Sequence, residues 1–429
     1  MRIASARRLK GVCSVPGDKS ISHRAALIAS LAQGVSTLKN FSNAADCAST
    51  LSCLSALGVR VEQDGTTVRI QGTKFHQPHT PLNCGNSGST IRMLAGLLAA
   101  GNLGCTLTGD ASLTARPMNR VIEPLELMGA RFKSDDGRPP LTVHGSEQLS
   151  AVEYVLPIPS AQVKTAVLLA GLQAHGRTTI KESFRTRDHT ERMLKWFGVD
   201  VEIENQPDLV KVSVNGPARL KSTTLKIPGD FSSAAYFMAA AAMLPGSDIE
   251  IKDVGLNPTR TQLIDLLRSF GANIETTDVR DECNEPNGTI RVRGRTLQRA
   301  SSNVIEGPST AALIDELPLF GVVGTQVPGG LVVRDAKELR VKETDRIAAT
   351  TKNLRAMGAT VEEFEDGFSL DGPVRLKGTT IQTYGDHRIA MAFSVAALLA
   401  DGESEITDSA SVAVSFPDFF ARLESLVER

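Results

Sequence analysis

The sequence predicts an α/β protein assembled from six copies of one structural unit of about 70 residues. Two recurring signatures lead to this prediction. One is a helix that ends at a glycine and is followed by a two-stranded hairpin. The other is a helix of small apolar residues that begins behind a cluster of Gly, Pro, Ser or Asp. Each unit therefore reads as strand, buried helix, strand, amphipathic helix and hairpin.

The first signature is a regularly spaced glycine at the end of a helix. Gly58, Gly129, Gly198 and Gly271 are 71, 69 and 73 residues apart, and Gly358 follows after 87, so one unit carries an insertion. Glycine is the usual residue after a helix end because it adopts the left-handed conformation without strain. After the first glycine we expect strands at 59–63 and 67–71. A sixth, truncated copy is expected as a final helix over 416–427.

The second signature is a helix with no polar face. Its six copies begin near Lys19, Ser87, Ser160, Ser232, Ser309 and Asp386. A helix that is apolar on all sides is a buried helix. The fifth copy, expected over 310–323, is interrupted by Asp315 and Glu316. A buried acid is costly unless it is paired, so these carboxylates belong either to a structural ion pair or to a reactive site.

The stretch from Pro16 to Arg24 is a candidate anion site. Its helix begins with Lys19, Ser20, His23 and Arg24. A helix start offers unpaired N–H groups and partial positive charge, which suit a phosphate or a carboxylate. The alternative interpretation is a capped surface helix with two solvated cations.

Further cations follow the repeat. Arg92, Lys164 and Arg388 stand beside the capping clusters, and Arg116, Arg187 and the stretch 340–346 lie in adjacent loops. Similar units packed around common axes would bring several helix starts together, and this basic ring would suit a small ligand with several negative charges. Each cation alone is more typical of a solvated surface.

Glu343 lies in the sequence between Lys342 and Arg346. A carboxylate among cations in a cleft can act as a general acid or base. The alternative is a surface ion pair between Glu343 and Arg346 on one helix, which contributes a few tenths of a kcal/mol.

Composition excludes several classes of function. The net charge is −1, which does not favour nucleic acid or an anionic membrane as partner. No apolar signal segment precedes Gly17, and the apolar run 234–244 is too short to span a bilayer. The six cysteines and seven histidines show no metal-binding spacing, which predicts free thiols in a cytoplasmic protein without a metal. No Gly-rich dinucleotide or ATP motif and no nucleophile elbow is present.

Seven short stretches along the chain carry charged residues, the first three together with Ser: 16–24, 85–92, 160–164, 186–190, 314–316, 340–346 and 386–388. In order and in composition they closely resemble the motifs of the 5-enolpyruvylshikimate-3-phosphate synthase family, an enolpyruvyl transferase family of the shikimate pathway. The resemblance implies a two-domain inside-out α/β barrel with three βαβαββ units per domain. It places one domain at 16–228, the other at 1–15 plus 229–429, and the active site in the cleft between them.

The resemblance also implies substrates and site residues. The substrates are shikimate 3-phosphate and phosphoenolpyruvate, no cofactor is needed, and a monomer is expected. The residues implied for shikimate 3-phosphate are Lys19, Ser20, Arg24, Ser160, Ala161, Gln162, Arg187, Asp315 and Lys342. Those implied for phosphoenolpyruvate are Lys19, Asn86, Gly88, Arg116, Gln162, Arg346 and Arg388. Asp315 resembles the base that takes the hydroxyl proton, Glu343 the acid that protonates the methylene carbon, and Lys19 is a third catalytic residue. Gly88 is similar to a position that bears on glyphosate, a competitor of phosphoenolpyruvate.

The chain departs from the residue pattern of the family at two places, and two alternative functions stay open. Many family members carry a Lys before the final Phe-Pro, but residues 412–417 contain none. Ser89 stands where Thr is usual.

UDP-N-acetylglucosamine enolpyruvyl transferase has the same fold and donor, but it uses a loop cysteine and a Lys-Asn pair. Here Lys19 precedes Ser20 and residues 110–120 contain no cysteine. A catalytically silent binding protein on this scaffold is the other alternative, against which the intact acid, base and cation set argues.

Overall fold

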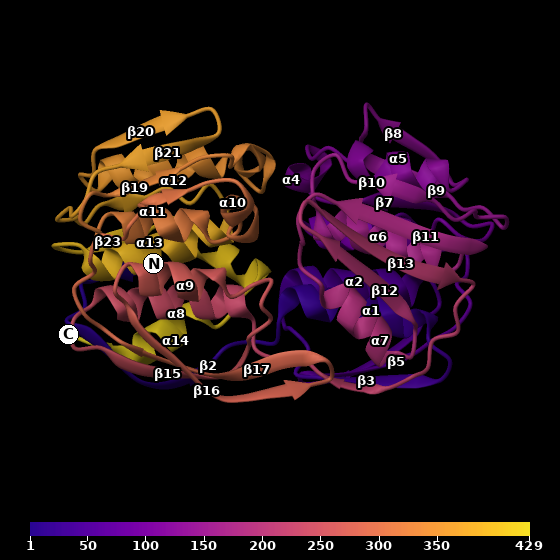
Figure 1. The fold of residues 1–429 in the computed structure, drawn as a ribbon, viewed down its shortest axis with the longest axis horizontal. Helices are drawn as coiled ribbons and strands as arrows, with labels where there is room; N and C mark the ends of the chain where they lie inside the picture. Colours follow the sequence, from indigo (N-terminus) through magenta and orange to yellow (C-terminus); the bar gives the residue numbers. More distant parts are fainter. The chain divides into compact units, whose positions relative to one another are not determined.

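The computed structural model describes all residues from Met1 to Arg429, which form two compact units (Figure 1). Unit 1 comprises Met1–Pro16, Pro228–Asp281 and Pro286–Arg429, and unit 2 comprises Gly17–Ile227 and Glu282–Glu285. The expected domain limits, 16–228 and 1–15 plus 229–429, differ from these units at Pro16 and Pro228, which belong to unit 1, and at one short segment of the second domain. The four residues Glu282–Glu285, at the tip of a hairpin, make their contacts with unit 2.

Unit 2 contains three four-stranded sheets, each with its own helices. The first sheet has the order β14 (Thr224–Lys226), β3 (Val35–Lys39), β5 (Thr67–Gln71), β4 (Arg60–Asp64), with helices α1 (Lys19–Leu31) and α2 (Ala45–Ala56). The second has the order β6 (Leu82–Asn83), β7 (Gly104–Thr108), β9 (Arg138–His144), β8 (Arg131–Asp135), with α3 (Gly88–Leu97), α4 (Ala111–Thr114) and α5 (Asn119–Leu127). The third has the order β10 (Glu153–Val155), β11 (Gly176–Glu182), β13 (Leu209–Gly216), β12 (Val201–Gln206), with α6 (Ala161–Gly171) and α7 (His189–Trp196).

Unit 1 also contains three sheets, and in Figure 1 its helices lie between the sheet of β15 and the sheet of β21. The first sheet has the order β16 (Asn273–Glu282), β17 (Glu285–Arg293), β15 (Asp248–Gly255), β2 (Arg8–Ser14), β24 (Val427–Glu428), with α8 (Phe231–Met243), α9 (Gln262–Ser269) and α14 (Phe419–Leu426). The second has the order β18 (Val304–Ile305), β19 (Leu331–Val333), β21 (Gly367–Leu370), β20 (Val361–Phe364), with α10 (Pro308–Ala312), α11 (Leu317–Gly324), η1 (Lys337–Val341) and α12 (Arg346–Ala356). The third has the order β1 (Arg2–Ile3), β23 (Ser404–Ile406), β22 (Thr380–Ile381), with α13 (His387–Leu399) and η2 (Ser409–Val414).

The pairing within the sheets confirms the predicted repeat. Each four-stranded sheet has one parallel pair, such as β6 with β7, extended by two antiparallel strands, such as β9 and β8. A parallel pair requires a crossover, and a buried helix supplies it between β6 and β7, β10 and β11, β18 and β19, and β22 and β23. The α/β class and the six βαβαββ units of the prediction are therefore correct.

Two repeats exchange their first strands. β2 precedes α1 in the sequence but pairs in parallel with β15, which follows α8. β14 precedes α8 but pairs in parallel with β3, which follows α1. Each unit therefore completes one of its sheets with a strand that the sequence places before a helix of the other unit.

The predicted buried helices form the core of each unit. α8 is buried along its whole length, and α13 along all but its last residue. In unit 1 the helices α8, α11 and α13 pack against one another, and in unit 2 α3 packs against both α1 and α6. Small side chains allow this close approach. At Gly96 of α3, an added Cβ would lie 2.1 Å from the Ala166 carbonyl oxygen of α6.

The predicted glycine helix ends are confirmed. Gly58, Gly129, Gly198, Gly271 and Gly358 have φ between 81° and 107°, and each follows the last residue of an amphipathic helix by two positions. These are the left-handed C′ positions that favour glycine. No helix of the structure is long and apolar enough to cross a membrane.

Two predicted helices differ from the structure. The helix expected over 310–323 is broken into α10 and α11, and Asp315 and Glu316 lie at the break rather than inside a helix. Pro318 explains part of this break, because it has no N–H to bond the carbonyl of Ile314. The final helix is shorter than expected, since α14 begins at Phe419 rather than at Phe416.

Candidate active site

Three helix starts of unit 2 carry most of the predicted ligand residues. Asp18, Ser87 and Ser160 are the N-caps of α1, α3 and α6, and each side chain accepts a backbone N–H three residues later. The caps place Lys19 and Ser20 in the first turn of α1, Gly88 at the start of α3, and Ala161 and Gln162 at the start of α6. Helix starts of this kind favour anions.

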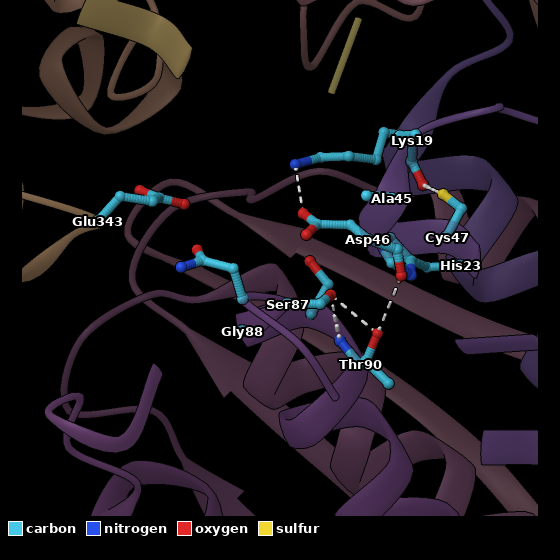
Figure 2. A network of polar contacts seen from close by, with 12 residues as sticks. Lys19, His23, Ala45, Asp46, Cys47, Ser87, Gly88, Thr90 and Glu343 are labelled. Atoms are coloured by element: carbon cyan, nitrogen blue, oxygen red, sulfur yellow. Dashed lines mark hydrogen bonds and ion pairs between the residues drawn. The ribbon is translucent and has the colours of Figure 1, made fainter. Parts of the chain in front are cut away.

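Lys19 is held by an acid that the sequence analysis did not single out. Its Nζ lies 2.8 Å from Asp46 Oδ2, and the side chain is 15% exposed (Figure 2). Behind the pair runs a buried chain of hydrogen bonds, from His23 Nδ1 through Thr50 and Thr90 to Ser87, at 2.7, 2.7 and 2.8 Å. Burial, and then the charges of Lys19 and Arg24, lower the pKa of His23 well below its usual value. His23 is therefore a neutral structural residue rather than an anion ligand.

Arg24 ties the starts of two helices together. Its Nη1 donates to the Ser20 carbonyl at 3.0 Å, and its Nη2 donates to the Ala161 carbonyl at 3.2 Å. Its Nε donates to Thr190 Oγ1 of α7 at 2.9 Å. Arg24 as a whole is 2% exposed, so these bonds form in a site with little water. Arg24 therefore brings the first turns of α1 and α6 into one polar cluster.

Gln162 is held at both ends of its amide. Arg92 Nη1 donates to Gln162 Oε1 at 2.9 Å, and Gln162 Nε2 donates to Ser89 Oγ at 2.8 Å. Arg92 was expected beside the anion site, and the structure makes it a neighbour that orients Gln162. The hydroxyl of Ser89 takes part in this contact, so a serine at this position keeps the donor and acceptor.

Asn86 and Arg116 form a second polar chain at the start of α3. Arg116 Nη2 donates to Asn86 Oδ1 at 2.8 Å, and Asn86 Nδ2 donates to Asp110 Oδ2 at 2.7 Å. Gly88 lies directly beside this chain. A Cβ built on Gly88 would be 2.7 Å from Arg92 Nη1 and 3.1 Å from Arg116 Nη1. Glycine therefore lets two guanidinium groups approach the backbone at the helix start.

Arg187 and Lys164 have different environments. Arg187 is half-buried in the loop between β11 and α7. Lys164 was expected to join the ring of ligand-binding cations, and this expectation is wrong. Its side chain is 0% exposed, with Nζ 2.9 Å from Glu182 Oε1 and 2.7 Å from Glu191 Oε1. An ammonium buried to this degree and paired with two carboxylates is part of the interior.

In unit 1, Arg346 is the centre of the predicted acid and base residues. Arg346 Nε lies 2.7 Å from Asp386 Oδ2, and its Nη2 lies 2.6 Å from Glu343 Oε2. Arg346 is 1% exposed, which excludes the alternative of a solvated surface ion pair with Glu343. Burial alone lowers the pKa of Arg346, but the carboxylates of Asp386 and Glu343 raise it overall. Arg346 therefore remains a cation and fixes the carboxylate of Glu343.

Asp315 lies among three cations. Its carboxylate oxygens are 3.6 Å from Arg346 Nη1, 3.6 Å from Arg388 Nη2 and 4.0 Å from Lys342 Nζ. Arg388 Nη1 also donates to the backbone carbonyl of Asp315 at 3.0 Å. The side chain of Asp315 is 16% exposed, so a ligand can reach it. The break between α10 and α11 is what brings this carboxylate out of the helical core.

Behind Asp315 is a second layer of polar residues around Glu316, in which Ser232 was predicted only as a helix start and Arg260 was not predicted. Ser232 Oγ donates to Glu316 Oε1, and Arg260 Nη2 donates to Ser232 Oγ at 2.7 Å. Arg388 Nη1 lies 3.5 Å from Glu316 Oε1. Burial alone lowers the pKa of Arg388, but Asp315, and to a lesser degree Tyr236 and Glu316, raise it overall. No sequence motif marks Arg260, which lies in an ordinary Pro-Thr-Arg loop.

The structure thus gathers the predicted residues into two sets. The first set lies at or beside the helix starts of unit 2 and comprises Lys19, Ser20, Arg24, Asn86, Gly88, Arg116, Ser160, Ala161 and Gln162. The second set is linked by contacts within unit 1 and comprises Asp315, Lys342, Glu343, Arg346 and Arg388. Each set joins cations to oriented polar groups, and the second also holds two accessible carboxylates. Such sites can bind compact anions and exchange protons with them.

A family model described as EPSP synthase (3-phosphoshikimate 1-carboxyvinyltransferase) matches residues 3–423 of the chain. The chain belongs to the EPSP synthase family. The 3-phosphoshikimate 1-carboxyvinyltransferase of Koribacter versatilis is 48% identical over 432 residues, which cover 100% of this chain and 99% of that protein. The EPSP synthase family is a family of carboxyvinyltransferases of the shikimate pathway, and the predicted family and enzyme class are confirmed.

Solved structures agree with this family. The EPSP synthase of Acinetobacter baumannii has a TM-score of 0.86 and 37% identity, and the match covers 99% of this chain and 97% of that chain. The enolpyruvyl transferase NikO of Streptomyces tendae has a TM-score of 0.78 at 17% identity, with 99% and 96% covered, which is a likeness of fold alone. The whole-chain family match decides against a UDP-N-acetylglucosamine enolpyruvyl transferase.

Proposed function

We propose that this EPSP synthase family member transfers the enolpyruvyl group of phosphoenolpyruvate to the 5-hydroxyl of shikimate 3-phosphate. The products are 5-enolpyruvylshikimate 3-phosphate and inorganic phosphate. The observation that supports this most directly is the pair of carboxylates, Asp315 and Glu343, each beside a different terminal nitrogen of the Arg346 guanidinium. A transfer of this kind needs one group to remove a proton and another to supply one.

The proposed residues for shikimate 3-phosphate come from both units. Those of unit 2 are Lys19, Ser20, Arg24, Ser160, Ala161, Gln162 and Arg187, and those of unit 1 are Asp315 and Lys342. The proposed active site is therefore the interdomain cleft that the family resemblance predicts. Lys19 and Arg187 supply positive charge for the phosphate and carboxylate of the substrate, and the hydroxyls of Ser20 and Ser160 supply donors.

Phosphoenolpyruvate would be bound by the guanidinium groups of Arg116, Arg346 and Arg388, with Lys19, Asn86, Gly88 and Gln162. Two polyanionic substrates repel one another, and a concentration of cations offsets that repulsion while it orients the reacting atoms. The fixed amide of Gln162 suits this task because both of its ends are already held.

The reaction then proceeds by addition and elimination. Glu343 gives a proton to the methylene carbon of phosphoenolpyruvate, which becomes a methyl group, and the neighbouring carbon becomes electron-poor. The 5-hydroxyl oxygen attacks that carbon while Asp315 takes the hydroxyl proton, so a C–O bond forms and a tetrahedral intermediate results. The C–O bond to phosphate then breaks, and the phosphate leaves with the proton that Asp315 had taken. The Glu343 carboxylate takes back one proton from the methyl group, which restores the vinyl group and both catalytic residues. Lys19 is proposed to stabilise the charge that develops on the leaving phosphate.

A release assay for inorganic phosphate tests this function. The purified protein is given phosphoenolpyruvate with either shikimate 3-phosphate or UDP-N-acetylglucosamine. We expect phosphate only with shikimate 3-phosphate, in amounts equal to the enolpyruvyl product. Release with UDP-N-acetylglucosamine alone, or release with neither acceptor, would contradict the proposal. The cytoplasmic location and the monomeric state remain predictions, and the second can be checked by light scattering.

A further inference from the structure

Lys164 has no part in the proposed chemistry, although it lies two residues after Gln162. Its ammonium group is fully buried between Glu182 at the end of β11 and Glu191 in the first turn of α7. Burial alone lowers the pKa of Lys164, but the charges of Glu191 and Glu182 raise it overall, so the group stays charged. An ion cluster of this kind rarely adds stability over packed apolar residues, which raises the question of what it holds in place.

Glu182 connects this cluster to the loop that carries Arg187. Its Oε1 accepts a hydrogen bond from the Lys164 ammonium and another, at 3.2 Å, from the backbone N–H of Thr186. Its Oε2 accepts the Thr186 hydroxyl at 2.7 Å. Both oxygens of one buried carboxylate therefore bind the residue immediately before Arg187.

The residue immediately after Arg187 is also held. Asp188 is buried, with Oδ2 2.8 Å from Arg185 Nη2 and Oδ1 2.9 Å from Arg192 Nε. Arg187 itself is only half-buried. The loop thus presents one partly exposed cation between two neighbours whose positions are fixed by charge-assisted hydrogen bonds, which are the strong and directional kind.

We propose that Lys164, Glu182 and Thr186 form a positioning relay that fixes the loop between β11 and α7 and thereby aims Arg187 at shikimate 3-phosphate. The inference rests on the proposed function, in which Arg187 binds that substrate. Lys164 orients the carboxylate of Glu182, Glu182 fixes the backbone and hydroxyl of Thr186, and Thr186 fixes the adjoining peptide of Arg187. None of the three touches the substrate, so they are positioning residues and not catalytic residues.

The relay explains why the buried group is a lysine rather than an apolar residue. An apolar side chain at 164 could fill the same space, but it would leave Glu182 without the charge that holds it inside the protein. A Glu182 carboxylate that turned toward water would release Thr186. Loop residues that bind ligands need such support because loops are otherwise the mobile parts of a fold.

The test uses variants that change the hydrogen bonds of the relay with little change in side-chain shape. Thr186→Val removes the hydroxyl, and Thr186→Ser keeps it. Glu182→Gln keeps the shape of the side chain but puts an N–H₂ group where one acceptor oxygen stood. In the phosphate-release assay we expect Thr186→Val and Glu182→Gln to raise the KM for shikimate 3-phosphate about fivefold. This is less than the direct effect of one lost charge-assisted hydrogen bond, because both residues act on the substrate only through Arg187. We expect kcat to change by less than about twofold, and Thr186→Ser to behave like the parent protein.

A double mutant separates positioning from a general loss of structure. In an Arg187→Ala background, Thr186→Val should add less than about twofold to the KM, because the side chain that it positions is gone. Thr106→Val is the matched control, since it removes one threonine hydroxyl that bonds Thr142 at 3.0 Å in another sheet. This control should leave the KM unchanged.

Three results would overturn the inference. If Arg187→Ala raises the KM and Thr186→Val does not, the relay is refuted while the proposed binding role of Arg187 stands. An equal effect of Thr186→Val with and without Arg187 would show that the hydroxyl acts by another route. If Arg187→Ala leaves the KM unchanged, the proposed role of Arg187 and the relay fail together.

Discussion

The substitution Gly88→Ala tests how closely the start of α3 fits its neighbours. The added methyl carbon would lie 2.7 Å from Arg92 Nη1, whereas ordinary contact begins at 3.4 Å, so the guanidinium must move by about 0.7 Å. That movement lengthens the 2.9 Å bond from Arg92 to Gln162 Oε1. A hydrogen bond to a charged group contributes about 1.5–3 kcal/mol, so even its partial loss costs about 1.4 kcal/mol. We expect the KM for phosphoenolpyruvate to rise about tenfold.

Glyphosate should lose more affinity than phosphoenolpyruvate does. It is the longer ligand, and the methyl group would intrude on it directly as well as through Arg92. Overpacking of a filled site costs about 1–3 kcal/mol, which corresponds to a further loss of about 5–150-fold. The measurements are the KM for phosphoenolpyruvate and the inhibition constant for glyphosate, taken in the phosphate-release assay for Gly88→Ala and the parent protein.

A second pair of variants checks the proposed cause. With Arg92→Ala already present, Gly88→Ala should raise the KM for phosphoenolpyruvate by less than about threefold, because the nearest clashing group has been removed. Equal losses for both ligands would refute the steric argument about glyphosate. An undiminished effect in the Arg92→Ala background would refute the role assigned to Arg92.

Three further predictions follow from the same contacts. Asp315→Ala should keep the fold and lower kcat by about two to four orders of magnitude, the usual cost of losing a general base; turnover within a few-fold of the parent protein would remove Asp315 from the mechanism. Lys164→Met should lower the free energy of unfolding by about 3–5 kcal/mol, because it leaves two buried carboxylates without their cation. The control Lys181→Met removes a partly exposed ion pair with Glu153 and should cost less than about 1 kcal/mol. Thermal or urea unfolding measures both. Similar losses for the two lysine variants would contradict this reading. Saturating shikimate 3-phosphate should lower the radius of gyration in small-angle scattering, because its proposed ligands belong to both units; an unchanged radius would argue against ligand-driven closure.

Local signals allowed much of the fold to be predicted. The positions of the C′ glycines depend only on the end of one helix, and all five have the expected left-handed conformation. The helix starts at Lys19, Gly88 and Ala161 depend on a cap one residue earlier, which the sequence also shows. These features need no knowledge of the rest of the chain.

Long-range features could not be predicted in the same way. The exchange of β2 and β14 between repeats joins strands whose paired residues are 238 and 187 positions apart, as in Asp248 with Lys10 and Thr224 with Thr37, and no local pattern marks it. The tip Glu282–Glu285 belongs to unit 2 because Glu285 lies 2.7 Å from His189, and neither residue indicates the other in the sequence. The family resemblance, rather than periodicity, placed the strand before Pro16 with the second domain.

The sequence also could not predict in which direction a polar side chain on an apolar helix points. Lys164 belongs to a helix that is apolar on all sides, so no polar face indicates whether it points to a ligand or into the interior. Asp46, the partner of Lys19, lies in a helix with no motif around it. Glu316 was singled out because an acid in an apolar run is unusual, but its hydrogen bond with Ser232, and the bond from Arg260 to Ser232, were not predicted.

Isotope incorporation tests the proposed addition and elimination most directly. When Glu343 protonates the methylene carbon in D₂O, the transient methyl group carries one deuterium and two protons, and elimination removes one of the three. The reaction is run in D₂O with unlabelled substrates, and the product is isolated and examined by mass spectrometry and NMR. We predict deuterium in the vinyl methylene of 5-enolpyruvylshikimate 3-phosphate. A product whose methylene carries only protium, formed together with phosphate, would contradict the mechanism assigned to Asp315 and Glu343.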